Sequence, residues 1–184
     1  MAEFTLHDTT SAPEEVRPRL EAAQASMGFI PNLFAKMAEA PAAVEAYQEL
    51  DAIFARTSLS AVEREVVLLA TSVYNRCHFC VAAHSGRAQK AGMDAADLEA
   101  LRRGGDLPNP RLDALARFTR AVVDQRGWVD DATVERFLEA GFERRQVLEV
   151  IIGVSIKTLS NYTNHITATP LNKELEPLAW DAAA

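Results

Sequence analysis

Apolar residues recur at helical spacing along almost the whole chain, and runs of strand-like alternation are absent. Proline, glycine and capping residues divide this pattern into about eight or nine helices joined by short turns. The pattern predicts helices over residues 13–28, 32–40, 41–56, 60–75, 77–90, 94–104, 109–127, 130–141 and 143–168. We therefore expect an all-α protein: a single-domain multi-helix bundle over residues 1–184, with peripheral tails at 1–12 and 173–184.

The clearest helix start is a capping box in which the Ser60 side chain accepts from the Glu63 amide and Glu63 reaches back. Asn32 is expected to cap the short second helix. Pro18 fits the first helix only if that helix begins a few residues after Pro13. The helix after Ser60 is expected to present one apolar stripe, formed by Val62, Val66, Leu69 and Val73.

Composition and charge exclude several classes of protein. Hydrophobic residues make up 48% and charged residues 24%, as in ordinary globular proteins. The net charge is −7 and the basic residues are scattered, which argues against nucleic acid and anionic membranes as partners. The apolar runs are too short to span a membrane, and the polar, acidic start does not resemble a signal peptide. We expect a cytoplasmic protein.

The two cysteines of the chain, Cys77 and Cys80, lie in one CxxC segment, and His84 follows one turn later. On a helix these three residues share a face, and the spacing brings His84 close enough to Cys80 for a hydrogen bond. An adjacent imidazole and the positive end of a helix dipole both favour a nucleophilic thiolate. The dipole favours Cys77 as the more acidic thiol and His84 favours Cys80; of the two, we favour Cys80. The pattern indicates a dithiol redox couple.

Glu65 stands twelve residues before Cys77, on the preceding helix. If the two helices pack as an antiparallel hairpin, its carboxylate reaches back towards the cysteines. Its apolar sequence neighbours are expected to raise the pKa of Glu65 and to suit it to proton transfer. The same cysteines with His84, and His78 as a fourth candidate, also offer zinc ligands, although His78 projects away from Cys77 on the helix. His165 is interpreted as a packing or subunit-contact residue.

The arrangement of Glu65, Cys77, Cys80 and His84, with Asn75 just before the first cysteine, resembles the signature of alkylhydroperoxidase D-like proteins in the carboxymuconolactone decarboxylase superfamily. Two further segments, 28–32 and 157–165, are similar to the peroxidase-related branch of that superfamily. The resemblance covers about residues 25 to 172. One difference is that the family enzyme has histidine directly before the second cysteine, where this chain has Phe79, with His78 one position earlier.

The resemblance implies an alkylhydroperoxidase D-like all-α fold that assembles as a homo-trimer or homo-hexamer. It implies an antioxidant peroxidase that reduces alkyl or hydrogen peroxides with electrons from a dithiol reductant, without metal, haem or flavin. By position, Cys80 would attack the peroxide, Cys77 would resolve the product to a disulfide, and Glu65 with His84 would relay protons.

The residues leave two other functions open. One is lactone decarboxylation within the same superfamily, against which the CxxC and His84 count, because the decarboxylase branch works without a redox CxxC. The other is a non-enzymatic helical oligomer that is switched by its thiols or binds zinc through them. Stoichiometric zinc would remove the free thiolate.

Overall fold

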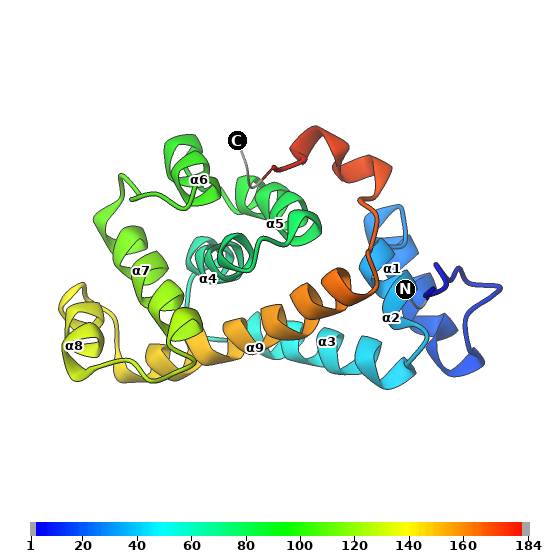
Figure 1. The fold of residues 1–184 in the computed structure, drawn as a ribbon, viewed down its shortest axis with the longest axis horizontal. Coiled ribbons are helices and arrows are strands. Elements are labelled where there is room, and N and C mark those ends of the chain that lie inside the picture. The colour runs from blue at the N-terminus through cyan, green and yellow to red at the C-terminus, as the bar shows by residue number, and fades with distance from the viewer. Residues whose placement is uncertain (1–2, 182–184) are drawn as a thin grey trace.

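A computed structural model describes residues 3–181, which form helices and connecting turns without a strand (Figure 1). The parts of the predicted tails at 1–2 and 182–184 lie outside the described residues. The helices are η1 (Glu14–Val16), α1 (Arg17–Met27), α2 (Asn32–Met37), α3 (Pro41–Phe54), α4 (Ala61–Tyr74), α5 (His78–Lys90), α6 (Ala95–Arg102), α7 (Pro110–Asp124), α8 (Asp131–Glu139), α9 (Arg144–Ile166) and η2 (Lys173–Leu178). The predicted all-α multi-helix fold is confirmed.

Local sequence signals set most of the helix boundaries. The Ser60–Glu63 capping box is formed in both directions, with bonds of 2.8 and 3.2 Å. Asp94, Asn109 and Asp130 cap α6, α7 and α8 through their side chains. Because each cap satisfies amide groups at the helix start, these boundaries do not depend on tertiary contacts.

Three boundaries differ from the sequence predictions. The first α-helix begins at Arg17, after a short 3-10 turn, which places Pro18 in its first turn where no amide is needed. Asn32 is the first residue of α2 and does not cap it; its side chain donates to the Pro170 carbonyl instead. Cys77 is the N-cap residue before α5, with extended backbone angles, and is not inside the helix.

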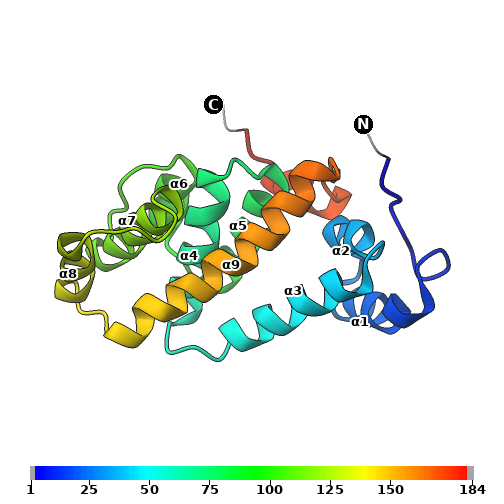
Figure 2. The same ribbon diagram turned by 60° about the horizontal axis from the view of Figure 1, so that its bottom comes forward.

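Helix α4 lies at the centre of the fold. It packs against α5, α6, α7 and α9, and Figures 1 and 2 show these helices on its several sides. Residues 65–72 are all buried, so the helix is covered all round, whereas the sequence pattern predicts a single apolar stripe. Glu65 therefore lies in the interior of the protein, on a helix whose other buried residues are mostly apolar.

Helix α9 crosses α3 and α4, and Gly153 allows the close approach (Figure 2). A Cβ atom at this position would lie 2.6 Å from Cγ1 of Val67 and 2.9 Å from Cζ of Phe54. Both neighbours are fully or almost fully buried. Neither can move aside without disturbing the core, because protein interiors are close-packed.

We expect Gly153→Ala to lower the free energy of unfolding by about 1–3 kcal/mol through overpacking. This would occur although alanine is favoured over glycine in a helix by about 1 kcal/mol. Urea denaturation measures the effect. Gly86→Ala is the control, because the added Cβ would approach only the flexible end of Leu178, at 2.9 Å. A Gly153→Ala protein more stable than Gly86→Ala would contradict the role given to this crossing.

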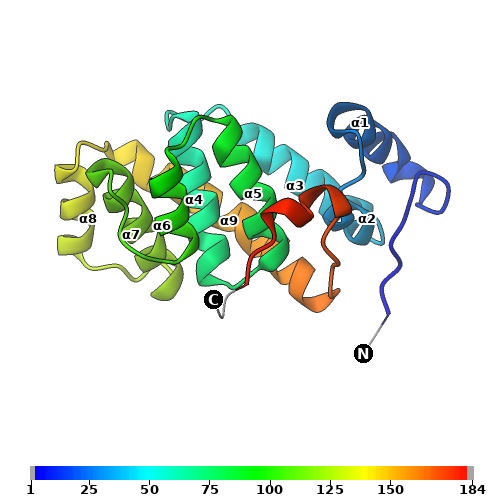
Figure 3. The same ribbon diagram turned by 90° about the horizontal axis from the view of Figure 1, so that it is seen from above.

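The terminal segments are tied to the helices next to them. Residues 173–181, predicted as part of a tail, pack along α5 (Figure 3). The Trp180 indole N–H donates to the Arg102 carbonyl at 2.9 Å, and Arg102 donates to the carbonyls of Leu178 and Ala179. At the other end, the amide of His7 donates to the Ala35 carbonyl at 3.2 Å. Over residues 3–181, no helix combines the length and the apolar character needed to cross a membrane.

Candidate active site

Both cysteines lie at the start of α5, where a sharp turn leaves α4. Arg76 takes a positive φ of 55° in this turn, and the Cys77 amide donates to the Ser72 carbonyl at 2.9 Å. Cys80 is the third residue of α5. Both are free cysteines, and each residue is only 1% exposed. This position puts the sulfurs near the positive end of the α5 dipole.

A buried amide network fixes that turn against α9. The Asn75 side chain donates to Oδ1 of Asn161 at 2.9 Å, and Asn161 donates to the Ser72 hydroxyl at 3.5 Å. Asn161 and Ser72 are fully buried. Because the α4–α5 turn is held on two sides, the backbone before Cys77 has little freedom to move.

The sulfurs face polar side chains of α9. Nδ2 of Asn164 donates to Sγ of Cys80 at 3.2 Å and to Sγ of Cys77 at 3.5 Å. The Ser160 hydroxyl lies 3.8 Å from Sγ of Cys80. Since one amide group reaches both sulfurs, the two thiols lie side by side. Oδ1 of the same asparagine is buried and has no hydrogen-bond partner among the described residues.

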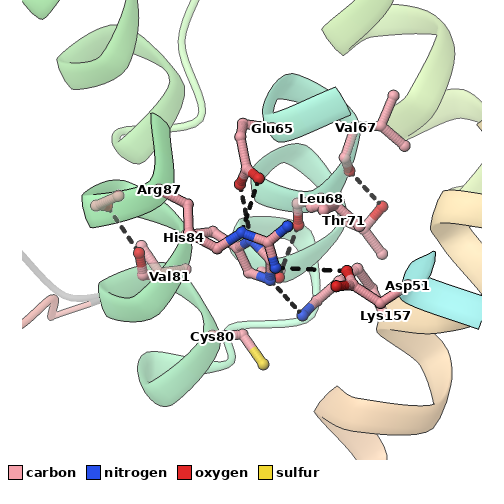
Figure 4. A network of polar contacts seen from close by, with 12 residues as sticks. Asp51, Glu65, Val67, Leu68, Thr71, Cys80, Val81, His84, Arg87 and Lys157 are labelled. Atoms are coloured by element: carbon pink, nitrogen blue, oxygen red, sulfur yellow. Dashed lines mark hydrogen bonds and ion pairs between the residues drawn. The ribbon is translucent and has the colours of Figure 1, made fainter. Parts of the chain in front are cut away.

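His84 lies between a carboxylate and an ammonium group (Figure 4). Its Nδ1 is 2.8 Å from Oε2 of Glu65, and its Nε2 is 2.8 Å from Nζ of Lys157. A lysine ammonium can only donate, so Nε2 accepts and Nδ1 carries the proton that is donated to Glu65. All three side chains are buried, and Lys157 has an exposure of 0%. The direct His84–Cys80 bond expected from the spacing is not formed, because both ring nitrogens are engaged by groups on α4 and α9.

The carboxylate of Glu65 also binds an arginine that faces solvent. Nε of Arg87 lies 3.0 Å from Oε1 of Glu65, and Nη1 of Arg87 lies 3.4 Å from Oδ1 of Asp51 (Figure 4). The Arg87 side chain is 47% exposed. A continuous chain of charged and polar groups therefore runs from the surface at Asp51 to the buried Lys157.

The two thiols have opposite acidities. Burial alone would raise the pKa of Cys80, but a hydrogen bond from Cys77 and the charge of Lys157 hold it well below its ordinary value. The hydrogen bond to Cys80, together with burial, raises the pKa of Cys77. At neutral pH the site therefore favours a Cys80 thiolate beside a Cys77 thiol.

The expectation of a raised pKa at Glu65 is wrong. Burial does act in that direction, but the hydrogen bond from His84 and the charges of Arg87 and Lys157 outweigh it and lower the pKa of the carboxyl group. Burial and the Lys157 charge lower the pKa of His84 below its ordinary value. Apolar neighbours in the sequence did not predict this result because the deciding charges come from other helices.

These pKa shifts predict acid-sensitive stability. A His84 pKa below 6.5 in the folded state means that only the unfolded chain takes up this proton as the pH falls below 6.5. The free energy of unfolding should then fall by up to about 1.4 kcal/mol per pH unit for this one proton. Glu65, whose folded pKa lies below 4.5, adds a further loss below that pH.

Urea denaturation between pH 8 and pH 5 measures this slope. His84→Gln should flatten the part of the slope that begins near pH 6.5, whatever it does to the absolute stability. An equal slope in wild type and His84→Gln would contradict the prediction.

Glu65, Cys77, Cys80 and His84 are predicted from the sequence as site residues, and the structure places all four in one buried cluster. Three further residues on α9 interact with the thiols and were not predicted: Lys157, Ser160 and Asn164. The signal was present as a run of polar residues at helical spacing within an otherwise apolar helix: Lys157, Ser160, Asn161 and Asn164. His165 is exposed, and His78 lies against the C-terminal segment, with Nδ1 2.7 Å from the Trp180 carbonyl oxygen.

His84 is not free to join the two thiols in binding zinc. Both nitrogens of His84 are within hydrogen-bond distance of other groups, so this histidine has no free nitrogen to offer a metal. Across residues 3–181, no three His, Cys, Asp or Glu side chains are grouped so as to hold a metal ion.

Comparison with known proteins agrees with the fold. Residues 38–121, which include both cysteines, Glu65 and His84, match the carboxymuconolactone decarboxylase family. No curated protein matches the sequence.

Solved structures resemble the whole chain. A peroxidase-related protein with an alkylhydroperoxidase D core, from Ralstonia eutropha JMP134, is 25% identical with a TM-score of 0.83; the match covers 94% of this chain and 93% of that one. A peroxidase-related protein from Silicibacter sp. TM1040 is 21% identical with a TM-score of 0.79, covering 95% of each chain. The debrominase Bmp8, in its C82A form with 2,3,4-tribromopyrrole, shares the fold at 14% identity and a TM-score of 0.78, covering 97% of this chain and 95% of that chain. Residues 38–121 thus match the carboxymuconolactone decarboxylase family, and the chain as a whole has the fold of alkylhydroperoxidase D-like, peroxidase-related proteins.

Proposed function

We propose that this protein is a thiol-dependent peroxidase that reduces hydrogen peroxide or alkyl hydroperoxides through a Cys77–Cys80 dithiol/disulfide cycle. The observation that carries the proposal is the pair of adjacent free cysteines, both bound by the Asn164 amide, with opposite acidities. A peroxidase of this kind needs one thiolate that attacks the peroxide and one thiol that then attacks the resulting sulfenic acid. Cys80 fits the first role and Cys77 the second.

The chemistry proceeds in two balanced steps. The Cys80 thiolate attacks the nearer peroxide oxygen, so that an S–O bond forms and the O–O bond breaks. The alkoxide or hydroxide that leaves takes up one proton to give an alcohol or water. Cys77 then attacks the sulfenic acid sulfur, which forms the disulfide and releases water. A dithiol reductant restores both thiols by exchange. Oδ1 of Asn164, which has no hydrogen-bond partner among the described residues, can accept a hydrogen bond from the hydroxyl group of the bound hydroperoxide.

The test is a titration of the reduced protein, without reductant, with one equivalent of hydrogen peroxide or tert-butyl hydroperoxide. We expect both thiols to disappear and the protein mass to fall by two hydrogen atoms; tert-butyl hydroperoxide should give one equivalent of tert-butyl alcohol. The Cys77→Ser, Cys80→Ser double variant is the control. Persistence of both thiols in the wild type would overturn the proposal.

Two other reactions are run in the same assay. Carboxymuconolactone tests the decarboxylase reaction named by the family, and its turnover by the double cysteine variant would favour that function. Tribromopyrrole tests the reaction suggested by the fold of Bmp8. Loss of thiols with tribromopyrrole but not with peroxides would replace the peroxidase proposal with a dehalogenase.

We also propose that the chain assembles as a homo-trimer or homo-hexamer. Support comes from large apolar side chains that are exposed along one helix, α9: Leu148, Ile151, Tyr162 and Ile166. Exposed apolar patches of this kind mark interaction surfaces. Light scattering coupled to gel filtration should give three or six times the chain mass of 20.2 kDa, and a monomer at micromolar concentration would contradict this.

A further inference from the structure

A fully buried lysine contacts the histidine of the site and interacts with the attacking thiol. Lys157 comes from α9, 73 residues after His84, and its Nζ lies 2.8 Å from Nε2 of that histidine. Its exposure is 0%. An ammonium group is costly to bury unless an anion neutralises it. The identity of that anion therefore decides what the lysine does.

The candidate anions that interact with Lys157 are Glu65 and Cys80. Glu65 is already paired with Arg87 at 3.0 Å and accepts from His84 at 2.8 Å. Cys80, one turn before His84, is left to balance Lys157, and the charge of each acts strongly on the other. If Cys80 were a neutral thiol, Lys157 would be a buried cation without its own counter-charge.

Resting on the proposed peroxidase function, we propose that Lys157 is a catalytic residue: its ammonium group holds Cys80 as a thiolate and gives its proton to the leaving alkoxide. In this arrangement Glu65 and His84 are positioning residues, because they act on the sulfur through Lys157. Nε2 of His84 orients one ammonium hydrogen, and Glu65 orients the ring through Nδ1. The remaining ammonium hydrogens are free to face the thiolate and the substrate oxygen.

The proton balance closes over one cycle. Lys157 loses a proton to the alkoxide when Cys80 becomes a sulfenic acid. The free amine then takes the Cys77 proton as that thiol attacks, and passes it to the departing hydroxide to form water. The dithiol reductant brings two electrons and two protons: one proton returns to the Cys77 thiol and one to Lys157, while Cys80 is regenerated as the thiolate.

The titration of the site involves groups on several helices. The groups coupled electrostatically to Lys157 are Tyr47 on α3, Glu65 on α4, and Cys77, Cys80 and His84 at or in α5. A measurement of the thiolate must therefore compare variants over a range of pH and not at one value. It must also be independent of peroxide, so that thiol activation is separated from peroxidase activity.

The first experiment measures the rate of Cys80 alkylation by iodoacetamide between pH 5 and pH 10, in proteins that retain only this cysteine (Cys77→Ser background). We expect Lys157→Met to lower the rate at pH 7 by at least about tenfold, a change worth about 1.4 kcal/mol. Lys157→Gln, which keeps a polar contact to His84, should lower the alkylation rate as much as Lys157→Met does. Lys157→Arg should retain most of the wild-type rate. Lys90→Met is the control, since Lys90 is exposed at the far end of α5. Alkylation as fast in both neutral variants as in the wild type would overturn the proposal.

The second experiment uses peroxides, in the otherwise wild-type protein and at a pH where alkylation shows the thiolate to be complete. Without the acid, Lys157→Met should slow the reaction with tert-butyl hydroperoxide more than with hydrogen peroxide, because tert-butoxide is the more basic leaving group. Equal slowing would overturn the acid role. If the wild type does not react with either peroxide, the proposed function fails, and the alkylation result still decides whether Lys157 holds the thiolate.

Discussion

Cys80→Ser is expected to lower the rate of peroxide reduction by at least about a thousandfold, the largest effect of any single substitution in this chain. The hydroxyl of serine is far less acidic than a thiol, so the positive charge and hydrogen bonds around position 80 cannot make it a nucleophile. The surroundings should otherwise be preserved, because Asn164 and Ser160 can bind an oxygen as they bind the sulfur. Stopped-flow measurement of peroxide consumption at neutral pH gives the rate.

Cys77→Ser is the matched variant. It retains the attacking thiolate, so we expect a first turnover within about tenfold of the wild-type rate, followed by arrest as a sulfenic acid. Dimedone should trap that species in Cys77→Ser and in no other single variant. A Cys80→Ser protein that still reacts, beside an inert Cys77→Ser protein, would exchange the two roles.

Glu65→Gln is expected to lower the free energy of unfolding by about 3 kcal/mol, the low end of the cost of breaking a buried ion pair by removing one partner. The carboxylate of Glu65 is the acceptor for His84 at 2.8 Å and for Arg87 at 3.0 Å. A glutamine oxygen can serve one of these donors, but its amide group would face the other. We choose the low end because the Arg87 side chain is half exposed and keeps its contact with water.

Asp51→Asn separates the buried pair from the surface pair. Asp51 binds the same arginine at 3.4 Å, but its side chain is 32% exposed and it does not contact His84. We expect its replacement to cost less than about 1 kcal/mol. Urea denaturation at pH 7 compares the two variants. Equal losses would show that the buried contact of Glu65 with His84 contributes little to stability.

Much of the fold was predictable because its signals are local. Ser60 caps its helix as the sequence predicts, and Asp94, Asn109 and Asp130 cap the helices that were predicted to begin at residues 94, 109 and 130. The predicted boundaries are wrong where a side chain or an amide group forms a hydrogen bond with another part of the fold. Asn32 turns from capping α2 to bind the Pro170 carbonyl, and Cys77 becomes an N-cap because its amide bonds back to Ser72. The burial of α4 on all sides was also not predictable from one apolar stripe, since it depends on how many helices surround it.

By itself, the sequence determined the all-α class, most helix starts and the grouping of Cys77, Cys80, His84 and Glu65, because these features depend on helical periodicity and on contacts between adjacent helices. Only the tertiary structure decided how the site is charged. Lys157 reaches His84 from 73 residues away, and Asn164 reaches Cys80 from 84 residues away. Electrostatic effects depend on distance in space and on burial, so the low pKa of Glu65 and the absence of a direct His84–Cys80 bond follow from the packing of α9 against α4 and α5.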